Sequence, residues 1–292
     1  MIDLPRIHIV APAGVTTKAK TRKGIKTISG FGFNCIEGKS LFNKNGYLAG
    51  TDKERLADFQ FAINDNPIAV WAARGGYGCS RIIDQINWKK FIKKPCWIVG
   101  FSDITIIHIF LSNNGIPSIH GPIINQAGDG VYKDEIIILS NLLKRYIFPE
   151  YILKTSIQNR IGEAISSITG GNLTLITSSL GTSSEIITDN KILFIEEVGE
   201  AAYRIDRMLI QLKRAGKLQK LRGLIIGHMT NITDEKEFGK TVSEIFLEHV
   251  SDYTFPVCFH FPAGHEAPNM PIILGMKAKL IVSKKSVSLK YL

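Results

Sequence analysis

Three short segments in the first half of the chain, each mainly apolar, constrain its fold most strongly. They span residues 6–11, 68–73 and 97–100, and each ends in a glycine-containing turn before a helix-like pattern begins. The run 68–73 is continuously apolar, which is typical of a strand buried on both faces, as in a parallel sheet. Strands that alternate with helices predict a doubly wound, mostly parallel α/β sheet. Ligand sites in such sheets lie at the carboxyl ends of the strands.

The pattern changes after residue 154. Residues 155–163 are polar and predict a linker. Beyond them, residues 191–196 and 224–228 predict strands, residues 201–215 and 234–250 predict helices, and residues 278–292 alternate like a hairpin about Lys284 and Lys285. We therefore predict an N-terminal α/β domain over residues 1–154 and a smaller, mixed α/β C-terminal domain over residues 164–292. Pro117 marks the short run 116–120 as an edge strand or a turn.

Composition favours a globular protein that binds neither nucleic acid nor a membrane. The 292 residues carry a formal net charge of +10, but the lysines are spread along the chain. They are not interleaved with aromatic residues, as a stacking platform for nucleic acid requires. No apolar run approaches the ~18 residues needed to span a bilayer. Residues 1–6 lack the basic and apolar segments of an export signal. We expect a solvated basic surface, no nucleic-acid partner and no membrane insertion.

The four cysteines form neither a CxxC pair nor a metal-ligand spacing, which indicates reduced thiols in the cytoplasm. Other site types lack their motifs as well. The chain has no complete GxGxxG, no GxxxxGK[ST] and no HExxH. It therefore indicates neither a dinucleotide site, nor a P-loop, nor a zinc hydrolase.

A serine stands in the turn after residues 97–100. Ser102 follows Gly100 by two residues and a helix-like pattern begins at once, as in turns that lift a serine hydroxyl above a sheet. The first N–H groups of that helix would lie beside the hydroxyl, where they can stabilise an oxyanion. Ser102 or Asp103 could equally cap an ordinary helix. Both interpretations stay open at this stage.

A nucleophilic serine needs a base, and the base needs an acid that orients it. His265 follows an apolar run in a Pro/Gly turn, where its side chain is either directed into a cleft or left on the surface. Three further histidines end apolar runs and remain candidates: His120, His228 and His260. Glu196 and Glu197 follow four apolar residues, and neighbours on a strand point to opposite faces. One of them can therefore face a cleft, unless both are solvated at the strand end.

A set of short motifs, taken in order along the chain, resembles a known family. The motifs are Ala11-Pro12-Ala13-Gly14, Ala49-Gly50-Thr51-Asp52, Arg74-Gly75-Gly76-Tyr77-Gly78, Gly100-Phe101-Ser102-Asp103, His120-Gly121-Pro122, Gly170-Gly171-Asn172-Leu173, Glu196-Glu197 and Gly264-His265-Glu266. Together they resemble the LD-carboxypeptidases, serine peptidases related to the microcin C self-immunity enzymes. The resemblance spans nearly the whole chain.

The resemblance implies a fold and an activity. It implies an N-terminal α/β domain that carries the nucleophile and a C-terminal domain, with a β-barrel-like core, that carries the acid and the histidine. The implied reaction releases terminal D-alanine from murein tetrapeptides at an L,D-peptide bond, in peptidoglycan recycling. The implied enzyme is a cytoplasmic homodimer that uses no metal and no organic cofactor.

The resemblance also implies residue roles. Ser102 would be the nucleophile, His265 the general base and then acid, and Glu196 the acid that orients His265. The oxyanion hole would be formed by the backbone N–H of Asp103 and one from the pair Gly75 and Gly76. Arg74 is our candidate for binding the free carboxylate of the substrate, with a structural role inside its turn as the alternative.

Two other functions stay open. A microcin-immunity-like hydrolase of peptidyl or aminoacyl nucleotides would use the same catalytic residues, although residues 74–79 favour the carboxypeptidase branch. A non-catalytic α/β module that binds a small peptide or nucleotide would need no triad at all.

Overall fold

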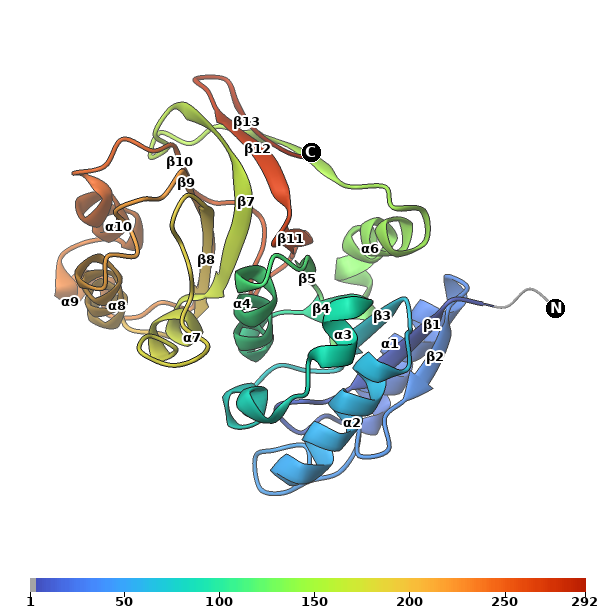
Figure 1. The fold of residues 1–292 in the computed structure, drawn as a ribbon. Coiled ribbons are helices and arrows are strands. Elements are labelled where there is room, and N and C mark those ends of the chain that lie inside the picture. Colours follow the sequence, from blue (N-terminus) through green and yellow to red (C-terminus); the bar gives the residue numbers. More distant parts are fainter. Residues whose placement is uncertain (1–3) are drawn as a thin grey trace.

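The computed structural model describes residues 4–292. Residues 1–3, which begin both the predicted N-terminal domain and the segment searched for an export signal, lie outside the described residues. Within residues 4–292 the strands form two sheets, one of six and one of seven strands. Helix α4 (Thr105–Asn113) lies between the two sheets and contacts both of them (Figure 1).

The first sheet has the strand order β11-β5-β4-β3-β1-β2. Its strands are β1 (Arg6–Val10), β2 (Asn34–Glu37), β3 (Ala69–Ala72), β4 (Trp97–Gly100), β5 (Ser118–His120) and β11 (Ile272–Leu274). The first five are parallel to one another and β11 is antiparallel, which confirms the predicted mostly parallel sheet. Strand β5 pairs on both sides, so it is not the edge strand that Pro117 suggested. Its second partner lies about 150 residues further along the chain.

Successive side chains of a strand point to opposite sides of this sheet, and each side is buried in a core of its own. Ile7, Ile9 and Trp71 belong to a core shared with α1 (Lys18–Gly30), α5 (Ile124–Ala127) and α6 (Lys133–Arg145). Val10 and Val70 belong to the core on the other face, with α2 (Asp52–Asn64), α3 (Lys89–Lys93) and α4. Helices therefore cover the sheet on both sides, as the doubly wound architecture requires.

The second sheet has the strand order β10-β9-β8-β7-β12-β13-β6. Its strands are β6 (Glu150–Lys154), β7 (Gly162–Asn172), β8 (Ile192–Val198), β9 (Gly223–Thr230), β10 (Val257–Cys258), β12 (Lys277–Val282) and β13 (Ser286–Tyr291). The half from β10 to β7 is parallel and the half from β7 to β6 is antiparallel. The mixed α/β class and the C-terminal hairpin are confirmed. Among the described residues the sheet stays open, so the expected β-barrel-like core is not a closed barrel.

Helices cover the parallel half of the second sheet. They are α7 (Leu173–Ser178), α8 (Ala202–Arg214), α9 (Glu235–Phe238) and α10 (Val242–Val250). The single helix predicted over residues 234–250 is divided in two, because Gly239 adopts φ +78° and ends α9. Strand β6 belongs to the second sheet and β11 to the first, so the chain passes between the sheets more than once. The division into domains at residues 154 and 164 stays a prediction.

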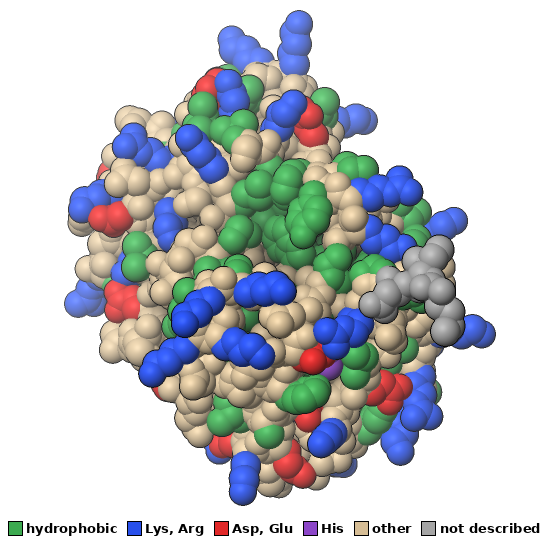
Figure 2. Space-filling model, turned by 45° about the vertical axis from the view of Figure 1, so that its right-hand side comes forward, with side chains coloured by type: hydrophobic (Ala, Val, Ile, Leu, Met, Phe, Trp, Pro, Cys, Tyr) green, Lys and Arg blue, Asp and Glu red, His purple; other side chains and the backbone are tan. Residues whose placement is uncertain are grey.

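The surface carries its basic side chains in a scattered arrangement. On the face shown in Figure 2, Lys and Arg are distributed over the whole outline, whereas apolar side chains gather in one hollow. Within the described part of the chain, no helix has the length and apolar character needed to cross a membrane.

Candidate active site

The serine turn lies at the carboxyl end of β4, where the sequence places it. Phe101 is extended, and Ser102 then adopts a φ of +63° at the start of a 3₁₀ turn (Ser102–Ile104) that leads into α4. A left-handed φ at a residue other than glycine costs on the order of 1–3 kcal/mol. A strained strand-to-helix turn of this kind exposes the nucleophilic serine in α/β hydrolases.

Helix capping does not account for Ser102 or Asp103. Neither side chain makes a capping hydrogen bond at the 3₁₀ turn or at the start of α4. The Asp103 carboxylate instead accepts a hydrogen bond from the Cys79 N–H at 2.7 Å. Ser102 is half-buried, and its hydroxyl caps no helix N–H among residues 4–292. The capping interpretation is therefore wrong for both side chains.

Glycine brings the loop at residues 74–78 against the serine. A Cβ atom at Gly75 would lie 2.8 Å from the Cβ of Ser102 and 3.0 Å from its Oγ, so a side chain here would displace one of the two segments. The loop is held on both sides of this contact. The Gly14 N–H donates to the Gly75 carbonyl at 3.0 Å, and the Cys79 N–H donates to Asp103.

The three backbone donors predicted for the oxyanion hole are not engaged in other hydrogen bonds. The N–H groups of Gly75, Gly76 and Asp103 make no hydrogen bond to any other group of residues 4–292. Donors that are fixed in place and not engaged elsewhere can stabilise a negative charge that develops on a substrate oxygen. Burial raises the pKa of the Asp103 carboxyl, whose role is to hold the loop through Cys79.

Glu196 and His265 form a buried pair. Glu196 lies near the end of β8 and is fully buried, and its Oε2 lies 2.6 Å from Nδ1 of His265, whose side chain is 16% exposed. His265 stands in the loop after β10. Gly264, with φ +142°, allows this loop to approach, because a Cβ there would lie 3.3 Å from Glu196 and 2.9 Å from the Cβ of His228.

The pair sets the basicity of the imidazole. Burial by itself would lower the pKa of His265, but the charge of Glu196 and its hydrogen bond outweigh burial and raise that pKa. With Nδ1–H assigned as the donor to Glu196, Nε2 is the nitrogen that accepts a proton.

Phe101 connects this pair to the serine turn. The ring of Phe101, the residue before Ser102, meets the His265 ring edge to face, with centroids 4.7 Å apart. No hydrogen bond joins His265 to Ser102 among the described residues. The structure therefore brings Glu196 and His265 into direct contact and packs His265 beside the serine turn. Catalytic hydrogen bonds are often long before substrate binds and shorten in the complex.

The neighbouring acid, Glu197, joins β8 to the end of β7, which lies against α4. It is buried and accepts hydrogen bonds from Nδ2 of Asn172 at 2.8 Å and from the Thr174 N–H at 2.7 Å, and burial raises its pKa. The Asn172 N–H donates to Oγ1 of Thr105 at 3.0 Å, just after the serine turn. A Cβ at Gly171 would lie 2.5 Å from the same Oγ1. Glu197 is thus not solvated, and its contacts hold β7 and β8 against α4.

The other candidate histidines have different surroundings. They are His120, His228 and His260, of which the last is exposed. His120 is fully buried between Phe101 and Phe194, and burial lowers its pKa well below the usual range. Nδ1 of His228 lies 3.0 Å from the exposed carboxylate of Glu266. Of the candidates, His265 is the one that combines a buried carboxylate with contact to the serine turn.

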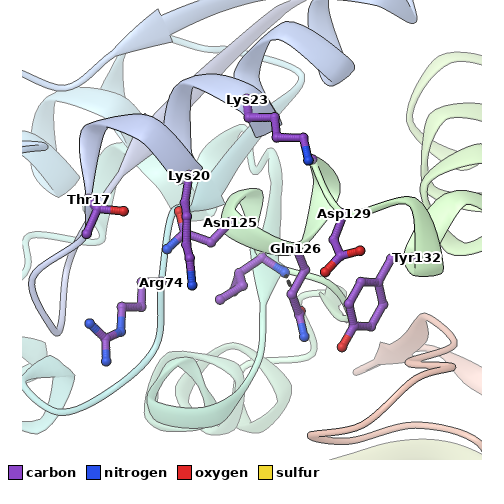
Figure 3. Close-up of a pocket in the computed structure, with 10 residues that line it drawn as sticks. Thr17, Lys20, Lys23, Arg74, Asn125, Gln126, Asp129 and Tyr132 are labelled. Atoms are coloured by element: carbon purple, nitrogen blue, oxygen red, sulfur yellow. Dashed lines mark hydrogen bonds between the residues drawn. The ribbon is translucent and has the colours of Figure 1, made fainter.

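Arg74 directly precedes Gly75 and lines a cavity. Its Nη1 donates to the Val15 carbonyl at 2.6 Å, which fixes part of the guanidinium and leaves its other donors available. The cavity has a volume of about 550 Å³ and also receives Lys20, Lys23, Asp129 and Tyr132 (Figure 3). Both roles that the sequence left open for Arg74 are therefore compatible with its position.

Sequence reasoning missed several residues of this region. The hydrogen bonds between Asp103 and Cys79 and between Asn172 and Thr105 join segments far apart in the chain. No local sequence pattern predicts them. Lys20 and Lys23 carried a weak signal, because residues three apart on a helix lie on one face.

Among residues 4–292, no group of three or more His, Cys, Asp or Glu side chains is arranged to hold a metal ion.

Comparison with known proteins adds independent findings. The models of the LD-carboxypeptidase N-terminal and C-terminal domains match residues 7–121 and 166–280. A probable murein peptide carboxypeptidase of Bacillus subtilis is 32% identical over 289 residues, covering 96% of this chain and 90% of that protein. The microcin C7 self-immunity protein MccF of Escherichia coli is 25% identical, covering 96% and 90%. The crystal structure of muramoyltetrapeptide carboxypeptidase from Oxalobacter formigenes is 26% identical, with a TM-score of 0.87 over 98% of each chain.

Proposed function

Because this chain belongs to the LD-carboxypeptidase family, we propose that it is a serine carboxypeptidase that releases the terminal D-alanine of murein tetrapeptides. The observation that carries the proposal is the buried Glu196–His265 pair, packed through Phe101 against the strained turn of Ser102. The names of the Bacillus subtilis and Oxalobacter formigenes relatives support murein peptides as the substrate class.

Ser102 is the nucleophile of the first step. Its Oγ attacks the carbonyl carbon that precedes D-alanine, and Nε2 of His265 takes the hydroxyl proton. The N–H of Asp103 and one N–H from Gly75 or Gly76 stabilise the oxyanion of the tetrahedral intermediate. The C–N bond then breaks, and His265 returns the proton to the leaving amine of D-alanine.

Water completes the cycle. His265 takes a proton from water as its oxygen attacks the acyl-serine, and then protonates Ser102 as the ester bond breaks. Glu196 holds the imidazole through Nδ1 and stabilises the imidazolium that forms in both steps.

Arg74 binds the carboxylate of the terminal D-alanine. Its loop continues directly into Gly75, whose backbone lies against Ser102. The hydrogen bond to Val15 occupies one donor and pre-orients the remaining ones toward an anion.

Mass spectrometry of a murein tetrapeptide incubated with the protein tests the function. We expect D-alanine release with the wild type and none with Ser102→Ala. An aminoacyl sulfamate adenylate, offered in parallel, tests the microcin-immunity alternative. No release of D-alanine by well-folded wild-type protein would refute the proposal, and binding of the peptide without turnover would favour a non-catalytic module.

We further propose that the enzyme works in the cytoplasm, in peptidoglycan recycling, as a homodimer. The four cysteines are free thiols, which suits a reducing compartment. The exposed apolar side chains of Tyr146, Ile147 and Phe148, three consecutive residues, suit a contact with a second copy. Sedimentation of the wild type and of Ile147→Asp tests the dimer, which the variant should weaken.

A further inference from the structure

A buried arginine joins two loops, residues 11–14 and 74–79, of which the second packs against the serine turn. Arg55 stands on α2, and its side chain has no exposed surface. Its Nη1 donates to the carbonyl of Pro12 at 2.5 Å and to the carbonyl of Gly78 at 2.9 Å. One nitrogen of the guanidinium therefore holds both loops. The catalytic triad does not account for this residue.

The ion pair with Asp52 does not explain why this charge is buried. Nη2 of Arg55 donates to the Asp52 carboxylate, but that carboxylate is 32% exposed and also accepts hydrogen bonds of 2.7 to 3.0 Å from Arg81. Burial of a guanidinium is costly unless its donors are bound. An exposed arginine pairs with Asp52 without that cost, as Arg81 does. The two backbone carbonyls are therefore the partners that need a buried arginine.

The two loops also meet directly, backbone against backbone. The Gly14 N–H donates to the Gly75 carbonyl at 3.0 Å, and a Cβ at Gly14 would lie 3.0 Å from that carbonyl oxygen. No side chain fits into this contact, so a second connection has to come from beside it. Arg55 provides that connection through Pro12 on one loop and Gly78 on the other.

The loop at residues 74–79 links both parts of the proposed oxyanion hole. It contains the N–H groups of Gly75 and Gly76, and its last residue, Cys79, donates its N–H to the Asp103 carboxylate at 2.7 Å. Burial raises the pKa of the Asp103 carboxyl, and the charge of Arg55 opposes that rise. Arg55 thus favours the ionised form of the acceptor that ties the loop to the serine turn.

We infer that Arg55 is a positioning residue of the oxyanion hole. It acts through the loop, because its bonds to the Pro12 and Gly78 carbonyls fix the backbone that carries the donors. The inference rests on the proposed function and adds a residue to the same site. Donors that are fixed in advance stabilise a transition state without reorienting during the reaction. Loss of Arg55 therefore lowers kcat and leaves binding of the ground-state peptide almost unchanged.

Three variants, assayed by D-alanine release from a murein tetrapeptide, test the inference. Arg55→Met removes the donors from a long side chain, and we expect kcat to fall by about 10²-fold or more with KM nearly unchanged. Arg55→Lys keeps the charge and a donor group and should recover part of this loss. Arg160→Met is the matched control, because Arg160 also donates to two backbone carbonyls, those of Val250 and Tyr253 at the end of α10. It should lower the resistance to urea and keep kcat.

A double variant separates positioning from a general effect on the fold. Gly75→Ala disturbs the same backbone donors directly, because its methyl group would meet Ser102. Substitutions that act through one shared backbone shift are not additive, whereas independent effects add. Arg55→Lys should therefore lower kcat much less in the Gly75→Ala protein than in the wild type.

The outcomes separate the inference from the proposed function. Unchanged kcat in folded Arg55→Met, an effect on KM alone, or full additivity with Gly75→Ala would overturn the inference and leave the carboxypeptidase function standing. If only Arg55→Met unfolds, wild-type kcat in Arg55→Lys would overturn it. Loss of the fold in both variants would also do so, because Arg55 would then be needed for the stability of the whole protein. A wild type that releases no D-alanine would refute the proposed function and the inference together.

Discussion

Replacement of Glu196 by glutamine tests how the buried pair works. The substitution keeps the shape of the side chain and removes the charge that lies 2.6 Å, atom to atom, from Nδ1 of His265. With charge centres about 4 Å apart and an effective dielectric constant of about 20, the lost attraction to the imidazolium amounts to about 4 kcal/mol. Since 1.36 kcal/mol corresponds to tenfold in rate, we expect kcat/KM at its plateau to fall by about 10³-fold.

The pH profile adds a second signature. Glu196 raises the pKa of His265 against the effect of burial, so without the carboxylate burial dominates and that pKa falls. The acidic limb of kcat/KM, which reports the base of the free enzyme, should therefore move to lower pH while the plateau drops. General damage to the fold would lower the plateau without moving the limb.

A second histidine–carboxylate pair provides a matched control. Nε2 of His249 lies 2.7 Å from Asp206, away from the serine turn. Asp206→Asn should leave both plateau and limb in place. Activity of Glu196→Gln within tenfold of the wild type, or a limb that stays or moves to higher pH, would refute the assignment of Glu196.

Three further predictions concern the serine turn and its surroundings. Asp103→Ala leaves the buried Cys79 N–H without its acceptor and should lower the free energy of unfolding by about 1–3 kcal/mol, whereas Asp103→Asn keeps an acceptor and should retain stability; urea denaturation measures both. Gly75→Ala places a methyl group 2.8 Å from the Cβ of Ser102 and should lower kcat by about 10²-fold or more in a D-alanine release assay, and an unchanged kcat would contradict the described loop position. Because the pKa of His265 is raised in the folded state, its contribution to stability is present below its unfolded pKa of about 6.5 and is lost as pH rises through the folded pKa. The stability advantage of the wild type over His265→Gln should therefore decline from about pH 6 upward, and a constant difference would contradict this.

The serine turn shows how far local sequence can predict a site. An apolar run, a glycine and a helix-like pattern placed Ser102 at a strand end, and the structure has it there with a φ of +63°. The same pattern allowed a helix cap. The tertiary structure excluded that alternative, because neither side chain caps a helix N–H and the Asp103 carboxylate accepts the Cys79 N–H.

The acids at the end of β8 show the opposite situation. Adjacent carboxylates after an apolar run indicated that one faces a cleft, but not which one, and a solvated pair was equally compatible. In the structure both are buried, Glu196 against His265 and Glu197 against Asn172. Burial of a carboxylate depends on the partners that compensate it, and those partners lie 69 and 25 residues away.

The sequence by itself determined the elements whose cause is local. Continuous apolar runs produced strands buried on both faces, and glycine marked the turns where a side chain or a negative φ does not fit, as at Gly75. Tertiary structure alone decided which of seven histidines meets a buried carboxylate, that β11 pairs with β5, and that the second sheet stays open. These outcomes depend on contacts between segments that are distant in the chain. The free energy of such contacts comes from packing and charge compensation, and no helical or strand periodicity in the sequence reveals it.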